Sequence, residues 1–144
     1  MTATDPLRTC LGLDYGLRRI GLAVGDTARR LAFAVGTHQE GRDGSALEHI
    51  SKLVAEREVH TLVVGLPLKT DGSEGDIALR ARRFASLLAE RLGLPVVLWD
   101  ERYSSQEADR WLQDKRRVSK GDRDALAAEI ILQNYLDSLE EEEA

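Results

Sequence analysis

Three short apolar runs lie within residues 10–37 of this 144-residue chain, and their close spacing is the strongest constraint on its fold. The runs are CLGLD, IGLAVGD and LAFAVGT, and the turn-like segments YGLRR and TARR separate them. Short runs rich in Leu, Val, Ile and Phe that are joined by tight connections are typical of antiparallel strands. We therefore expect the chain to begin with an antiparallel meander of three strands.

The rest of the chain alternates between helical and strand patterns. The apolar stripes predict helices at about residues 45–58 and 75–92, a short helix that begins at Ser104, and a last helix at about residues 122–139. Two continuous apolar runs, TLVVGLP and VVLWD, are typical of strands that are buried on both faces. Because each of these strands follows a crossover helix, we expect them to pair in parallel.

These elements predict an α/β fold with one five-stranded mixed sheet, in which two parallel strands join the antiparallel meander and helices cover both faces. The length fits a single domain over residues 1–144. We expect about residues 1–7 to be an N-terminal extension and about residues 139–144 to be an acidic tail.

The cysteine content and hydropathy of the chain favour a cytoplasmic protein that does not enter a membrane. Cys10 is the only cysteine, so no internal disulfide can form. The N-terminus lacks the basic-then-apolar layout of a signal peptide, and no stretch approaches the roughly 20 apolar residues that span a bilayer. The three histidines are scattered, so a bound metal would need oxygen ligands.

The net charge of −5 is unevenly distributed along the chain. Four of the negative charges form the run at residues 140–143, whereas the segment KRRVSKGDR at residues 115–123 carries five basic residues and one acid. A basic segment on a nearly neutral body is compatible with nucleic-acid binding. Charge runs are also common on ordinary solvated surfaces, so the two interpretations remain open at this point.

Acidic residues follow two of the predicted strands. Asp14 ends the run LGLD directly before Tyr15 and Gly16, and Asp100 and Glu101 follow the strand VVLW. An Asp before a Gly often only serves a turn, and one acid of the second pair can cap or pair locally. However, ligands of sheets with parallel strands gather at the carboxyl ends of the strands, where these acids are expected to lie.

Asp124 lies near the start of the last predicted helix. It precedes Ala128 by four, Ile131 by seven and Tyr135 by eleven residues, which places it on the apolar stripe that faces the sheet. A carboxylate directed at a core is costly unless it is paired or binds a metal. The alternative is a first-turn acid favoured by the helix dipole, a role that Asp122 also fits.

Asp14, Glu101 and Asp124 can therefore converge at one edge of the sheet. Carboxylates without a histidine cluster suit Mg²⁺ or Mn²⁺, which prefer hard oxygen ligands. Such ions activate water and stabilise the leaving oxygen in phosphodiester cleavage. We expect these three residues to be both the metal ligands and the catalytic residues, and whether Asp100 or Asp122 also contributes remains open.

The loop GLPLKTDGSEG at residues 65–75 is the longest unusual motif. Its glycines lead to a helix N-terminus, where backbone N–H groups can receive a phosphate, and Lys69 can add a positive charge. The loop is not a P-loop because no GK[ST] motif follows, and a plain connection between strand and helix is the alternative.

Four blocks of the chain resemble the YqgF/RuvX family of the RNase H-like superfamily. They are LGLDYGLRRIGLAVGD, VVGLPLKTDGSEG, VVLWDERYSSQEA and KGDRDALAAEIILQNYL, in the expected order and over nearly the whole domain. The resemblance implies an RNase H-like fold and places the family's acidic residues on Asp14, Glu101 and Asp124. The chain departs from the family pattern at Lys69-Thr70, where Asn-Met is common, and this difference bears on substrate contacts.

The family is described both as Holliday junction resolvases and as nucleases that mature the end of pre-16S ribosomal RNA. The expected function is therefore a metal-dependent nuclease that acts on structured RNA. The alternative is a resolvase of four-way, branched DNA, which would need a homodimer. A non-catalytic nucleic-acid-binding module and an actin-like phosphate-binding ATPase are less favoured, since the ATPase needs a second domain copy. The residues expected to contact phosphate are Arg18, Arg19, Lys69, Arg102, Arg116, Arg117 and Lys120.

Overall fold

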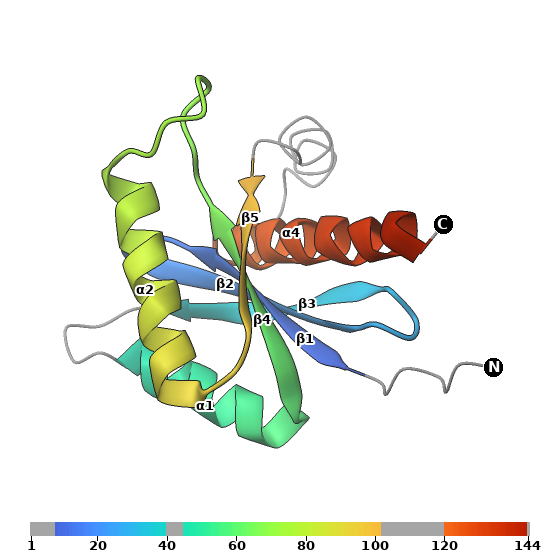
Figure 1. Ribbon diagram of the computed structural model, residues 1–144. Coiled ribbons are helices and arrows are strands. Elements are labelled where there is room, and N and C mark those ends of the chain that lie inside the picture. Colours follow the sequence, from blue (N-terminus) through green and yellow to red (C-terminus); the bar gives the residue numbers. More distant parts are fainter. Residues whose placement is uncertain (1–7, 40–44, 102–119, 144) are drawn as a thin grey trace.

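The computed structural model describes residues 8–39, 45–101 and 120–143, which contain a sheet and helices on both of its faces (Figure 1). The predicted short helix from Ser104 lies outside the described residues. The other predicted elements are all present. They are β1 (Thr9–Tyr15), β2 (Arg19–Asp26), β3 (Ala32–Gln39), α1 (Ser45–Arg57), β4 (Val59–Leu66), α2 (Asp76–Leu92), β5 (Val96–Asp100) and α4 (Lys120–Glu143).

The five strands form one mixed sheet in the order β3-β2-β1-β4-β5. β1 pairs with β2 and β2 with β3 in antiparallel fashion, whereas β4 is parallel to both β1 and β5. The predicted meander and parallel pair are therefore confirmed. β1 lies in the centre and joins the two halves of the sheet.

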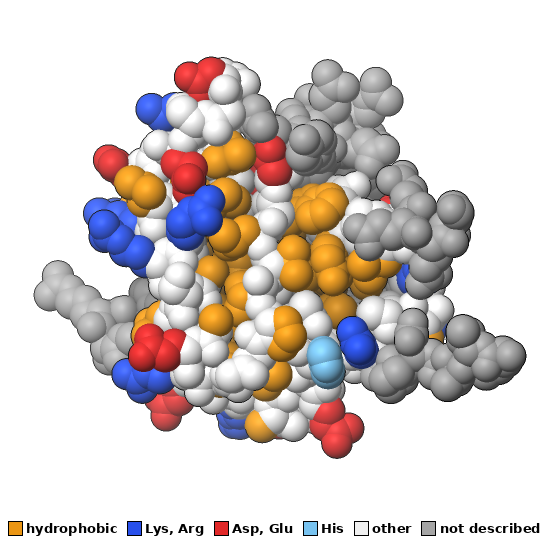
Figure 2. All heavy atoms as spheres, in the orientation of Figure 1, with side chains coloured by type: hydrophobic (Ala, Val, Ile, Leu, Met, Phe, Trp, Pro, Cys, Tyr) orange, Lys and Arg blue, Asp and Glu red, His pale blue; other side chains and the backbone are white. Residues whose placement is uncertain are grey.

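Each face of the sheet has its own hydrophobic core because side chains alternate along a strand. Leu11 and Leu13 of β1 pack in the cluster that includes residues of α1 and α2, whereas Cys10 packs with Leu132 of α4. Figure 1 shows α1 and α2 on one side of the sheet and α4 across the other. Figure 2 shows apolar side chains on both sides of the edge strand β5.

Glycines bring α4 unusually close to the sheet. A Cβ atom at Gly12 would lie 2.7 Å from the Cβ of Leu132, and one at Gly21 would overlap the backbone carbonyl of Asp124. Any larger residue at Gly21 would push the beginning of α4 away from β2. The apolar stripe of α4, with Ala128 and Leu132 fully buried, therefore rests directly on the backbone of β1 and β2.

The predicted helix boundaries agree with the structure except for the last helix. α2 ends as expected at Gly93, which adopts a left-handed conformation (φ 65°) and donates its N–H to the carbonyl of Ala89 at 2.9 Å. α4 begins at Lys120 and continues to Glu143, whereas we expected about residues 122–139. Part of the expected acidic tail is therefore helical. None of the helices in the described ranges combines the length and apolar character needed to cross a bilayer.

Candidate active site

Two predicted acids meet at the carboxyl ends of the parallel strands. Asp14 is the next-to-last residue of β1, and Glu101 directly follows β5. Because β1 and β5 are both parallel to β4, their carboxyl ends lie at the same edge of the sheet. The carboxyl groups of Asp14 and Glu101 are joined by a hydrogen bond.

Two glycines make the space for the acids around Asp14. Gly21 of β2 is the antiparallel partner of Asp14, and the backbone of Asp124 rests on it. On the other side of Asp14, Gly65 of β4 follows the partner of Leu13, and the carboxylate of Glu101 lies against it. A side chain at either glycine would therefore displace an acid of the site.

Crowding of the carboxyl groups opposes their ionisation. Burial raises the pKa of Asp14 well above its ordinary value, and the negative charge of Glu101, the hydrogen bond with Glu101 and the charge of Asp124 raise it further. The pKa of Glu101 is also raised, by burial and by the charge of Asp100, although its hydrogen bond with Asp14 acts in the opposite direction. We conclude that the pair readily retains a shared proton.

Asp124 lies beside this pair but has a cationic partner. The Nε–H of Arg19 donates to Oδ2 of Asp124 at 2.7 Å, and the two side chains remain 39% and 27% exposed. Arg19 is the first residue of β2, two positions before Gly21. This ion pair therefore links the beginning of α4 to β2, next to the pair formed by Asp14 and Glu101.

The three predicted acids are therefore neighbours without forming a ready-made metal centre. Within the described ranges, no three His, Cys, Asp or Glu side chains are grouped as a metal site requires. The donor set nevertheless fits Mg²⁺ or Mn²⁺, because two crowded carboxyl groups with raised pKa values offer hard oxygen ligands that a cation would favour. Asp124 can join such a set only when its carboxylate contacts the cation as well as Arg19, or when it releases Arg19.

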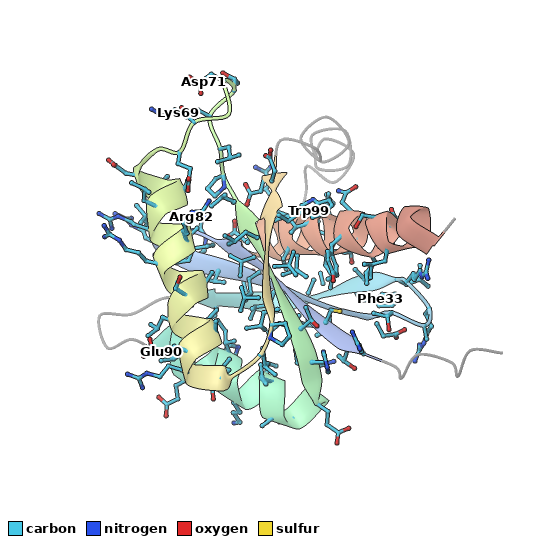
Figure 3. The ribbon with its side chains drawn as sticks, viewed as in Figure 1. Phe33, Lys69, Asp71, Arg82, Glu90 and Trp99 are labelled. Atoms are coloured by element: carbon cyan, nitrogen blue, oxygen red, sulfur yellow. The ribbon has the colours of Figure 1, made fainter. Side chains whose placement is uncertain are left out.

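The predicted phosphate-binding loop uses its polar groups internally. The N–H of Lys69 donates to the carbonyl of Ser73 at 3.0 Å, that of Gly72 to Lys69 at 2.8 Å and that of Ser73 to Oδ1 of Asp71 at 2.9 Å. These three amides are thus occupied, and a phosphate at the N-terminus of α2 stays a prediction. Lys69 and Asp71 lie in the loop that projects beyond β4 and α2 (Figure 3).

The other predicted phosphate contacts fall into two groups. Arg18 is exposed in the turn between β1 and β2, next to Arg19. The remaining ones are not placed, because Arg102, Arg116 and Arg117 lie outside the described residues and Lys120 is described only as the first residue of α4.

Basic side chains that sequence reasoning did not single out gather over α2 in Figure 2. Exposed residues of this helix include Arg80, Arg82 and Arg83. Arg82 donates to Glu74 at 2.8 Å, so its charge is partly satisfied within the protein.

Sequence reasoning also missed the two glycines and the role of Arg19. The signal for the glycines was present, because Gly21 and Gly65 interrupt otherwise apolar strand runs, where a glycine often marks a close approach. No local signal pointed to the Arg19–Asp124 pair, since 105 residues separate its members.

Comparisons with known proteins agree on one family. Residues 8–138 match the model of the RuvX family, which is described as "Holliday junction resolvase". A protein of Anaeromyxobacter sp. (strain K) is 46% identical over 130 residues, which cover 88% of this chain and 95% of that protein. A protein of Burkholderia lata is 42% identical over 138 residues, covering 94% and 93%. Both carry the name "Putative pre-16S rRNA nuclease".

A solved structure has the same fold. Thermus thermophilus RuvC in complex with a Holliday junction substrate superposes with a TM-score of 0.64 at 14% identity, over 92% of this chain and 96% of that one. The likeness extends over nearly the whole domain, and the predicted RNase H-like fold is confirmed.

Proposed function

Because this chain belongs to the RuvX family, we propose that it is a metal-dependent nuclease that hydrolyses phosphodiester bonds. The observation that carries the proposal is the hydrogen-bonded pair of Asp14 and Glu101 at the carboxyl ends of β1 and β5. Acids whose pKa values are raised by burial and by each other are typical of functional sites. Family membership and site geometry thus support the same chemistry.

Asp14, Glu101 and Asp124 would hold a divalent ion, Mg²⁺ or Mn²⁺. When bound, the ion would activate water and stabilise the charge that develops on the leaving oxygen. Asp14 and Glu101 would lose their shared proton when the cation binds. Arg19, whose guanidinium lies at the edge of this pair, would offset the negative charge of the substrate phosphate.

We propose that the substrate is the end of pre-16S ribosomal RNA. The names of the relatives that are 42% and 46% identical support this choice. Such a substrate would place the protein in the cytoplasm. Structured RNA would contact the protein through its phosphates, for which Arg18, Lys69 and the basic segment at residues 115–123 are candidates.

Cleavage of a four-way DNA junction is the second candidate, because the matching family is described as a Holliday junction resolvase. That reaction would require a homodimer in which two sites face two symmetry-related strands. A measurement of the molecular mass in solution, with and without junction DNA, tests this requirement.

The deciding experiment compares purified protein on a pre-16S ribosomal RNA fragment and on a four-way DNA junction, each with Mn²⁺. We expect cleavage of the RNA, and loss of at least about 100-fold of the rate in Asp14→Asn, because ligand loss should exceed the effect of losing a supporting residue. Glu90→Gln, on the exposed side of α2, is the matched control and should cut at the wild-type rate. Cleavage by Asp14→Asn at the wild-type rate would refute the assigned site.

A further inference from the structure

The ion pair between Arg19 and Asp124 has a position that the proposed reaction does not explain. Asp124 is held by Arg19 at 2.7 Å, while the other two acids of the site are hydrogen-bonded to each other. Asp124 is also near enough to Asp14 for its charge to act on that residue. Asp124, one of the three expected metal ligands, is thus paired with the Arg19 guanidinium instead of being free to bind a metal ion.

The geometry makes this pair exchangeable. Both side chains are partly exposed, and ion pairs of this kind contribute little to stability. Only the Nε–H of Arg19 is engaged by Asp124. Within the described part of the chain, its two Nη groups make no hydrogen bond. A phosphate that accepts two parallel hydrogen bonds from the Nε–H and one Nη–H would therefore compete with Asp124 for the Nε–H.

The backbone of the site is fixed, so only side chains need to move. The backbone of Asp124 packs against Gly21 of β2, and the carboxylate of Glu101 packs against Gly65 of β4. Leu132 and Leu136 anchor the rest of α4 in the core. Release of the Asp124 carboxylate therefore requires rotation of two partly exposed side chains and no displacement of the helix.

Resting on the proposed nuclease function, we propose that Arg19 exchanges partners when the substrate binds. In the free protein Arg19 holds Asp124. When a substrate phosphate arrives, Arg19 transfers to it and leaves Asp124 to join Asp14 and Glu101 around the divalent ion. Arg19 is thus a positioning residue that couples metal binding to substrate binding, and the complete metal site forms only with nucleic acid in place.

A double-mutant cycle on Mn²⁺ affinity tests the exchange without any substrate. Isothermal titration calorimetry would measure Mn²⁺ binding to the full-length wild type, Arg19→Gln, Asp124→Asn and the double variant. We expect Asp124→Asn to bind Mn²⁺ within about twofold of the wild type, because Asp124 is not a ligand in the free protein. Arg19→Gln should bind at least about fivefold more tightly, and the double variant should lose this gain.

Each contrary outcome identifies a different error. Weaker Mn²⁺ binding by Asp124→Asn alone would show that Asp124 is always a ligand and would overturn the exchange. Equal tightening by Arg19→Gln with and without Asp124 would reduce the effect of Arg19 to its charge, and would overturn it too. Absence of Mn²⁺ binding by Arg19→Gln would do the same. Arg83→Gln, on the exposed side of α2, should leave the affinity unchanged, and thermal unfolding confirms that each variant folds.

A second set of titrations adds an RNA fragment that resists cleavage because its riboses carry 2′-O-methyl groups. RNA binding itself is measured by fluorescence anisotropy. Where RNA binds, we expect it to tighten Mn²⁺ binding at least about fivefold in the wild type and not in Asp124→Asn. Binding of RNA without this tightening would overturn the exchange. A protein that binds no RNA would refute the proposed substrate and leave the exchange to be decided by the metal titrations alone.

Discussion

The residue Asp14 shows how function and stability oppose each other in this molecule. Its carboxyl group is partly buried beside two further acids, which disfavours its charged form. The raised pKa of Asp14 means that the folded protein binds more protons than the unfolded chain above the ordinary pKa of 3.8. The contribution of Asp14 to stability is therefore greatest below that value and is lost as the pH rises through the folded pKa.

We expect Asp14→Asn to stabilise the metal-free protein at pH 7, because an amide does not ionise. Its thermal midpoint should exceed that of the wild type, and the difference should shrink as the pH approaches 4, where the wild-type carboxyl is protonated. Thermal unfolding followed by circular dichroism between pH 4 and 8 measures this, with Glu90→Gln as the control. A lower midpoint for Asp14→Asn at pH 7 would contradict the assigned direction of the pKa shift.

The absence of a side chain at residue 65 matters as much as the acids do. A methyl group at Gly65 would meet the Glu101 carboxylate and the Cδ1 atom of Ile131, both of which are ends of flexible side chains. We expect Gly65→Ala to fold at a cost of about 1–3 kcal/mol and to lose at least about tenfold in Mn²⁺ affinity. Gly75→Ala is the control variant, because its methyl group would meet only the flexible end of the Lys69 side chain. Wild-type Mn²⁺ affinity in Gly65→Ala would show that Glu101 does not depend on this space.

At the scale of elements, α4 protects an edge of the sheet as well as supplying an acid. β3 is an edge strand, whose outward backbone groups would otherwise invite pairing with another chain. The N–H of Ala32 donates to Oε1 of Gln133 at 2.9 Å, and that of Ala34 donates to Oε1 of Glu129 at 2.8 Å. Two side chains of α4 thus cap the part of β3 that they reach.

Loss of these two caps should expose the edge. We expect the double variant Glu129→Ala/Gln133→Ala to lose at least about 1–3 kcal/mol in free energy of unfolding, measured with urea. Each hydrogen bond contributes about 0.5–1.5 kcal/mol, and Gln133 also donates to the carbonyl of Arg30 at 2.8 Å. Light scattering should also reveal association that increases with protein concentration. Glu56→Ala, on the exposed side of α1, controls for the loss of an acid. An unchanged urea midpoint would show that the caps contribute nothing to stability.

For the whole molecule, the sequence was sufficient to predict the sheet and the pair of acids at its edge. Period-two and helical patterns are local, and the handedness of crossovers then determines how β1, β4 and β5 align. What could not be predicted depends on contacts between distant segments. The ion pair of Arg19 with Asp124 joins residues far apart in the sequence, and so does the close packing of α4 on Gly21. Both contacts form only when the chain has folded.

The long sequence separation of Arg19 from Asp124 has a consequence for the protein during its synthesis. The strand that carries Asp14 is translated before α4, the last described element. At about 5–20 residues per second, the 105 residues from Arg19 to Asp124 take on the order of 5–20 s to synthesise. Throughout that interval the nascent chain holds Asp14 without the helix that completes its surroundings. A site that depends on Asp124 is therefore incomplete until α4 has been synthesised.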